Sequence, residues 1–145
     1  LFALLIQRLL PEADSKYNPE CSHNQLADFL LDQGSDALVA VGTTGESPTL
    51  THTEKVEIYR TLAQHLKGRA PLIAGTGSYS TAEAVSLSQA AEQAGAQAVL
   101  VVNPYYNKPS QEGLYQHFSA VAQAIDIPVI LYNHPGRTGV ALSVE

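Results

Sequence analysis

The chain has 145 residues, enough for one ordinary domain with a hydrophobic core. Hydrophobic residues make up 45% of it and charged residues 15%, which excludes a disordered chain, a collagen-like chain and a coiled coil. No apolar run approaches the roughly 20 residues of a membrane span, so no membrane partner is expected. The formal net charge of −6, with Lys and Arg scattered, argues against a nucleic-acid partner. The single cysteine, Cys21, favours a reducing, cytoplasmic location.

The chain opens on an apolar stretch, Leu1–Leu10, in which we expect a buried first strand. Residues 7–21 are polar and contain two prolines, so they are expected to be loop. The chain contains no methionine and stops at Glu145 without a closing helix. We therefore expect it to be incomplete at both ends.

Four further apolar runs predict strands. Each has four to six residues rich in Val, Ile or Leu, as in strands that are covered on both faces of a parallel sheet. The runs are Asp36–Val41, Pro71–Ala74, Ala98–Val102 and Pro128–Leu131.

Amphipathic segments with helix start signals separate these strands. Ser22–Gln25, Thr51–Glu54 and Ser80–Glu83 each predict a capping box, in which a hydroxyl bonds a free backbone N–H and the Gln or Glu reaches back. Ser110 is expected to cap a fourth helix. Glycines able to end a helix follow the first three segments at positions 34, 68 and 95.

Strands that alternate with helices predict parallel βαβ units, and two architectures fit them. A five-stranded doubly wound sheet has the length of this chain, whereas a (β/α)8 barrel needs about 250 residues and this chain would be its first five βα units. A doubly wound sheet gathers ligand chemistry at one switch point, but here every strand from the second onward runs into unusual residues. We therefore predict a truncated barrel and keep the doubly wound sheet as the alternative.

The first of these loops carries two adjacent hydroxyls, Thr43 and Thr44, between glycines. Such a turn can hold a carboxylate through hydroxyl and backbone donors, although it can also be an ordinary strand-to-helix connection. Glu46 follows in the same loop, and we expect its carboxylate to bond loop N–H groups.

Tyrosines and one arginine stand out in the later loops. Tyr132 ends an apolar strand and should point into the mouth of a barrel, whereas Tyr105 and Tyr106 follow Pro104 in a loop. A Tyr hydroxyl beside a Thr hydroxyl can pass protons if its pKa falls from about 10, and packing is the alternative role. Arg137 lies in a turn with two glycines, where it can grip a carboxylate bidentately or simply be solvated.

The histidines do not form a metal site. His52 and His65 share one helix but are thirteen positions apart, and His23 lies at a helix start. His117 is expected on the polar side of the fourth helix, and His134 in a loop. No metal is therefore expected.

Four ordered motifs carry a resemblance to a known family. The sequences GTTGESP, IAGTG, NPYYNKPSQ and YNHPGRTG resemble those of dihydrodipicolinate synthases, in the Schiff-base pyruvate aldolase family to which N-acetylneuraminate lyases also belong. The resemblance runs from about Asp28 to Glu145, and residues 1–27 match poorly. The motifs begin at Gly42, Ile73, Asn103 and Tyr132. Residues 1–145 are therefore expected to be part of one barrel domain.

The resemblance implies a (β/α)8 barrel that assembles as a homotetramer when complete. Its implied activity is the condensation of pyruvate with aspartate semialdehyde through a lysine Schiff base, giving 4-hydroxy-tetrahydrodipicolinate for lysine and diaminopimelate biosynthesis. The imine acts as the electron sink, so no cofactor is implied. Paired threonines and Arg137 favour this synthase over a sugar-acid lyase of the N-acetylneuraminate type, which remains the nearest alternative. A non-catalytic fragment and a doubly wound binding module are the alternatives from other classes.

The resemblance also implies roles for individual residues. Thr43, Tyr106 and Tyr132 would form a proton relay, with Tyr106 reaching the site of a neighbouring subunit. Thr44 would bind the pyruvate carboxylate, and Arg137 the carboxylate of aspartate semialdehyde.

The implied Schiff-base lysine would lie beyond Glu145, on a sixth strand. None of the chain's own lysines ends an apolar strand, where burial would lower its pKa, so the chain by itself is expected to be inactive. These lysines are Lys16, Lys55, Lys67 and Lys108.

A lysine-feedback site is implied as well. It would use Ser47, His52, Glu83 and Tyr105. Tyr79 stands where regulated members resemble one another in carrying Asn, and Lys55 replaces a His, so the regulatory pattern is incomplete.

Overall fold

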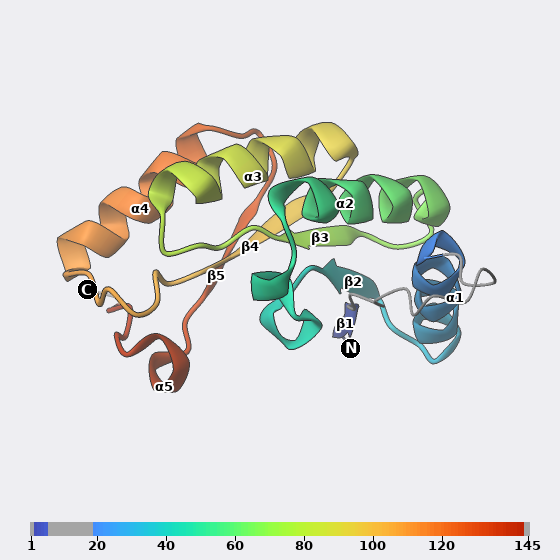
Figure 1. Cartoon of the computed structure of the whole chain (residues 1–145), viewed down its shortest axis with the longest axis horizontal. Helices are drawn as coiled ribbons and strands as arrows, with labels where there is room; N and C mark the ends of the chain where they lie inside the picture. The colour runs from blue at the N-terminus through green and yellow to red at the C-terminus, as the bar shows by residue number, and fades with distance from the viewer. Residues whose placement is uncertain (1, 6–18, 144–145) are drawn as a thin grey trace.

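Five parallel strands form one sheet in the order of the chain, β1-β2-β3-β4-β5, in the computed structural model, which describes residues 2–5 and 19–143 (Figure 1). Every neighbouring pair of strands is parallel, from Phe2 opposite Ala37 to Val102 opposite Tyr132. The strands are β1 Phe2–Leu5, β2 Ala37–Ala40, β3 Leu72–Gly75, β4 Ala98–Val102 and β5 Val129–Tyr132.

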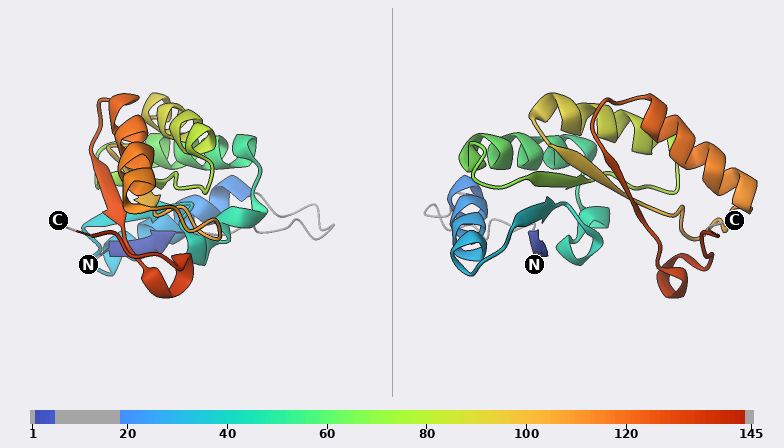
Figure 2. Two further views of the ribbon diagram at one scale, coloured as in Figure 1. Left: turned by 90° about the vertical axis from the view of Figure 1, so that its left-hand side faces the viewer. Right: turned by 180° about the vertical axis from the view of Figure 1, so that it is seen from behind.

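Helices follow the strands one by one along the chain. They are α1 Pro19–Asp32, α2 His52–Leu66, α3 Thr81–Ala94, α4 Gln111–Gln123 and the short α5 Pro135–Thr138, with two 3-10 turns, η1 Thr43–Gly45 and η2 Ser47–Thr49. Helices α2, α3 and α4 lie side by side on the same side of the sheet, and α5 lies on the opposite side (Figures 1 and 2).

Alternating strand residues show that, among the described residues, α2, α3 and α4 pack against one face of the sheet. Leu38, Leu72 and Val99 belong to the large core cluster that also contains buried side chains of α2, α3 and α4. Val39 and Ile73, on the other face, form a small cluster with strand neighbours only. A sheet wound in one direction with helices outside curves into a barrel, whereas a doubly wound sheet reverses its strand order and carries helices on both faces. The barrel prediction is confirmed and the doubly wound alternative is wrong.

The predicted capping residues explain where most of the helices begin. Thr51 accepts from the Glu54 N–H and the Glu54 carboxylate accepts from the Thr51 N–H, so the predicted box is complete. Ser110 caps α4 through the Gly113 N–H. Ser80 caps α3, but the box there is only half formed, because the Glu83 carboxylate contacts His52 instead of turning back.

The start of α1 differs from the prediction. The helix begins at Pro19, so Ser22 lies inside its first turn and residues 19–21 are helical rather than loop. Proline suits the first position of a helix because its missing N–H would have no partner there. The remainder of the predicted loop, from residue 7 to residue 18, lies outside the described residues.

His117 is buried, contrary to its expected place on a polar helix face. Its Nδ1 lies 2.9 Å from the Thr81 hydroxyl at the start of α3, and its ring packs edge-on against Phe118. Burial lowers the pKa of the imidazole, so the neutral ring is favoured. The polar face of α4 is therefore partly an interface with α3.

Among the described residues, no helix is both long and apolar enough to cross a membrane.

Candidate active site

A pocket of about 380 Å³ lies on the inner face of the sheet, at the carboxyl ends of the strands. Parallel strands bring these ends to one edge, so loops that are far apart in sequence share its wall. The polar side chains that line it are Thr43, Thr44, Ser47, Tyr105, Tyr132, Arg137 and Thr138. This volume suits a small organic molecule.

The loop after β2 brings both threonines to the pocket. Val41 has a left-handed backbone with φ 57°, an unusual state for a β-branched residue, and it turns the chain sharply away from the strand. Thr43 and Thr44 follow in η1 with exposed side chains that line the pocket. Glu46 does not act as expected, because its backbone carbonyl, rather than its carboxylate, accepts bonds from the Thr49 N–H and hydroxyl.

Two glycines allow the strand ends to approach one another. A Cβ on Gly75 would lie 2.5 Å from the Val41 carbonyl oxygen, and one on Gly77 would lie 2.5 Å from the Val102 nitrogen. Backbone atoms cannot yield to a side chain at that distance, so both positions require glycine. The pocket floor depends on this close approach.

Tyr132 and Arg137 supply the wall formed by β5 and α5. Tyr132 is the last residue of β5, as predicted, and Arg137 lies in the single turn of α5. Thr138 is buried beside Arg137, and its hydroxyl bonds the carbonyls of His134 and Val140. Arg137 is the one charged side chain that lines the pocket within the described residues. The pocket therefore offers a cation and several hydroxyls, the donors that a carboxylate needs.

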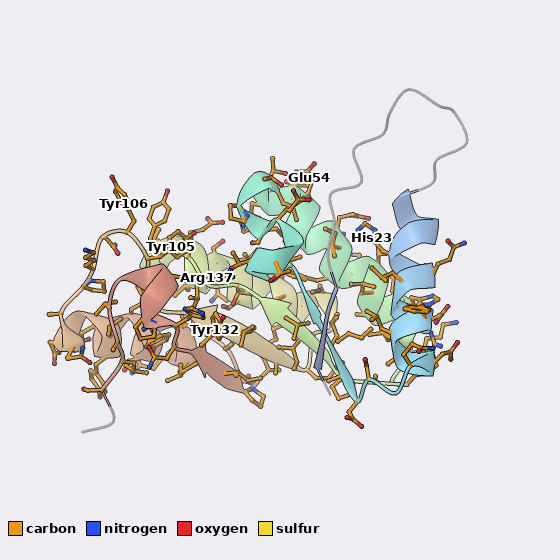
Figure 3. All side chains as sticks on the ribbon, turned by 90° about the horizontal axis from the view of Figure 1, so that it is seen from below. His23, Glu54, Tyr105, Tyr106, Tyr132 and Arg137 are labelled. Carbon is orange, nitrogen blue, oxygen red and sulfur yellow. The ribbon has the colours of Figure 1, made fainter. Side chains whose placement is uncertain are left out.

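The two tyrosines of the loop after β4 take different positions. Tyr105 lines the pocket and packs edge-on against Tyr79, with ring centroids 5.4 Å apart. Burial and the nearby Tyr79 phenol raise the pKa of Tyr105. Tyr106 has φ 72°, is 94% exposed and does not line the pocket of its own chain. Figure 3 shows Arg137 and Tyr132 close together, and Tyr106 at the outer edge of the molecule.

The residues of the implied regulatory site fall into separate contacts. His52 Nδ1 lies 3.0 Å from Glu83 Oε1, whereas Tyr79 packs on Tyr105. Burial lowers the pKa of Lys55, and the Glu83 carboxylate partly opposes this effect. Ser47, the remaining member of the implied set, lies in η2 and lines the pocket.

No lysine of the described ranges lines the pocket. Over residues 2–5 and 19–143, no three His, Cys, Asp or Glu side chains converge as a metal site would require. The pocket is also lined by Val41, Leu100, Val102 and Thr138, which were not predicted to belong to it. Period-two alternation along β4 could have assigned Leu100 and Val102 to the inner face, but nothing local marks the backbone state of Val41.

This fold and this pocket define the first part of a (β/α)8 barrel whose site lies at the strand ends. Residues 14–145 match the sequence profile of the Dihydrodipicolinate synthetase family. The chain belongs to that family.

Individual relatives agree with this assignment. The chain is 58% identical over 118 residues to the 4-hydroxy-tetrahydrodipicolinate synthase of Desulforudis audaxviator, covering 81% of this chain and 40% of the relative. The corresponding Bacillus subtilis enzyme is 53% identical over 120 residues, covering 83% and 41%. The chain therefore spans about 40% of the length of these relatives.

Solved structures extend the similarity to the fold. The Aquifex aeolicus dihydrodipicolinate synthase superposes with a TM-score of 0.90 at 45% identity, covering 99% of this chain and 47% of that one. The chloride-inhibited Acinetobacter baumannii enzyme, complexed with pyruvate, gives 0.83 at 51% identity, with 86% and 43% covered.

Proposed function

We propose that this chain is the pyruvate-binding part of an aldolase-type synthase. The complete protein would condense pyruvate with aspartate semialdehyde through a lysine Schiff base and yield 4-hydroxy-tetrahydrodipicolinate. The observation that carries the proposal is that Thr43, Thr44, Tyr132 and Arg137 line the same pocket. Both substrates are carboxylates, and this pocket combines hydroxyl donors with a guanidinium. The similarity to a synthase complexed with pyruvate supports the same assignment.

The reaction needs little from the protein beyond an amine, proton transfer and charge stabilisation. A lysine amine adds to the pyruvate ketone with loss of water, and the resulting imine loses a proton from its methyl group to give an enamine that attacks the aldehyde carbon. The amino group of aspartate semialdehyde then attacks the imine carbon, so that the ring closes and the lysine amine leaves. Thr44 would hold the pyruvate carboxylate, while Thr43 and Tyr132 would move protons between the reacting atoms and solvent. Arg137 would bind the carboxylate of the second substrate.

Tyr106 would complete the relay in a neighbouring subunit. It is 94% exposed, lies outside its own pocket and is held in a left-handed backbone conformation. A bulky aromatic residue in that state normally has a functional or packing reason. A homotetramer of the complete protein, located in the cytoplasm, belongs to the same proposal.

Borohydride trapping with pyruvate tests the proposal. We define the completed chain as this sequence continued with the C-terminal part of the Bacillus subtilis relative, of which this chain covers 41%. Intact mass should show a reduced pyruvate adduct on the completed chain and none on the 145-residue chain. A solvated lysine has a pKa near 10.4 and attacks ketones poorly at neutral pH.

Two outcomes would contradict the proposal. The first is an adduct on the 145-residue chain at Lys67, Lys108 or the half-buried Lys55, whose pKa is lowered by burial. The second is a completed chain that traps pyruvate but cleaves N-acetylneuraminate in preference to consuming aspartate semialdehyde. That result would assign the pocket to a sugar-acid lyase.

A further inference from the structure

Two side-chain amides bind the chain segment that follows α5. Asn133 accepts from the Leu142 N–H at 3.1 Å and donates to the carbonyl of the same residue at 3.4 Å. Gln111, the first residue of α4, accepts from the Ser143 N–H at 2.9 Å and donates to the Ala141 carbonyl at 2.8 Å. Each amide thus satisfies one donor and one acceptor of the backbone, as a neighbouring strand would.

A third amide ties this segment to the end of β4. Asn103 is fully buried, and its Nδ2 donates to Asn133 Oδ1 at 3.0 Å and to the Val140 carbonyl at 3.2 Å. Its backbone N–H separately donates to the Tyr132 carbonyl at 3.2 Å. Asn103, Gln111 and Asn133 together are called the amide clamp below.

The orientation of the Asn103 amide follows from its partners. The Leu142 N–H can only donate, so the Asn133 atom that receives it is the oxygen. That oxygen and the Val140 carbonyl can only accept, so Asn103 must present its NH2 group to both. A side chain without two hydrogens on one atom cannot make this bridge.

The bridge continues toward the pocket. The Val140 carbonyl also accepts from the Thr138 hydroxyl at 2.9 Å, and Thr138 lines the pocket next to Arg137. We propose that Asn103 is a positioning residue that holds α5, and with it the Arg137 guanidinium, against the pocket. It thereby sets the affinity for the second, carboxylate-bearing aldehyde. This inference rests on the proposed function, since it deepens the role of Arg137 there.

Removal of the amide should loosen α5 without leaving a buried acceptor unpaired. The Val140 carbonyl keeps its bond from Thr138, and Asn133 Oδ1 keeps its bond from Leu142. The Asn103 backbone bond to Tyr132 also survives. Asn103→Ala should therefore retain the fold and weaken the binding of the aldehyde more than that of pyruvate.

Gln97 offers a control at the other end of the same strand. It directly precedes β4, whereas Asn103 directly follows it, and its exposed side chain bridges two backbone groups, the Leu72 N–H and the Gly95 carbonyl. Gln97→Ala removes this bridge at the opposite end of the sheet from the pocket. This substitution should change neither the KM for aspartate semialdehyde nor pyruvate trapping.

Kinetics on the completed chain give the first readout. Asn103→Ala should raise the KM for aspartate semialdehyde about 10-fold, because a displaced binding group loses much of its effect, while kcat and pyruvate trapping stay within about twofold. Gln111→Ala, at an exposed clamp position, should give a smaller change in the same direction. An unchanged KM in Asn103→Ala, or a rise equal to that of Gln97→Ala, would overturn the proposal.

Amide hydrogen exchange on the 145-residue chain gives a readout independent of activity. Asn103→Ala should speed exchange of the Thr138, Gly139 and Leu142 N–H groups at least about 10-fold, as expected for local opening, and Gln97→Ala should not. Unchanged exchange would overturn the positioning role whatever the kinetics. If Asn103→Ala accelerates exchange but the unsubstituted completed chain does not trap pyruvate, the positioning role of Asn103 is supported and the proposed function is rejected.

Discussion

The hydroxyl of Tyr59 donates a 2.7 Å hydrogen bond to the carbonyl oxygen of Gly75. Tyr59 lies in the middle of α2 and is fully buried, whereas Gly75 ends β3 and lines the pocket. Burial, together with the charge of Glu83, raises the pKa of this hydroxyl far above its ordinary value, so it remains a donor at any physiological pH. The outer helical layer is thus bonded directly to the pocket floor.

Replacement of Tyr59 by Phe should lower the free energy of unfolding by about 1–3 kcal/mol, since the Gly75 carbonyl would lose its buried donor. Urea unfolding of the 145-residue chain measures this. Tyr115→Phe is the control, because Tyr115 is 65% exposed and its hydroxyl can bond water. Equal effects of the two substitutions would show that the Tyr59 bond contributes nothing.

A methyl group at Gly75 should lower the free energy of unfolding far more than its size suggests. It would lie 2.5 Å from the Val41 carbonyl oxygen and 2.9 Å from its carbon, so the ends of β2 and β3 would have to separate. We expect Gly75→Ala to lower the free energy of unfolding by about 2–3 kcal/mol, as overpacking does. Gly136→Ala, whose new methyl would make ordinary contacts beginning at 3.5 Å, should cost little in the same unfolding experiment. Similar values for both would contradict the close approach.

Burial of His117 predicts a pH dependence of stability. Its folded-state pKa is lowered below the ordinary 6.5, so its contribution is complete above pH 6.5, where both states are neutral. As the pH falls below 6.5 the unfolded chain binds a proton that the buried ring resists. The free energy of unfolding should therefore fall until the pH passes the folded-state pKa.

Urea midpoints at pH 8, 6 and 5 test this dependence in His117→Asn, whose amide can take the place of Nδ1 beside Thr81. The variant should lose part of the decline that the parent shows below pH 6.5. His65→Asn is the control, because His65 is only partly buried and bonds Asp28 between α1 and α2. A decline of unchanged size in His117→Asn would contradict the prediction.

Loss of the Arg137 guanidinium should affect the reaction with aspartate semialdehyde but not the reaction with pyruvate in the completed chain. Arg137→Ala should reduce kcat/KM for aspartate semialdehyde about 100-fold, the scale of a bidentate ion pair, and leave pyruvate trapping nearly unchanged. Arg60→Ala, which removes an exposed arginine paired with Glu57 on α2, is the control. If trapping and condensation fall equally, Arg137 has a structural role instead.

Local patterns predicted most of the secondary structure. Apolar runs located β2 to β5 to within about one residue at each end, and Thr51 and Ser110 marked the starts of α2 and α4. These signals succeed because a strand's composition and a cap's hydrogen bond involve residues close together in the chain. The start of α1 was missed because Pro19 and Ser22 are both acceptable first-turn residues.

The pocket was predictable in outline for a topological reason. Once the strands are parallel, their carboxyl ends must meet at one edge, so the hydroxyls of Thr43, Thr44 and Tyr132 were expected at one end of the sheet. These residues and Arg137 line one pocket. The catalytic and binding roles of these residues stay predictions. The sequence supports only their placement at one edge of the sheet.

Contacts across the chain were decided only by the tertiary structure. Glu83 leaves its capping box for His52, thirty-one positions away, and His117 is buried against Thr81, thirty-six positions away. The Asn103 bridge to Val140 spans thirty-seven positions. The sequence by itself determined the alternation of strands and helices and the edge of the sheet at which the polar pocket residues lie. Both depend on local composition and on strand direction. Which side chains meet depends on register and on the packing angle of each helix, and these are set by the whole folded chain at once.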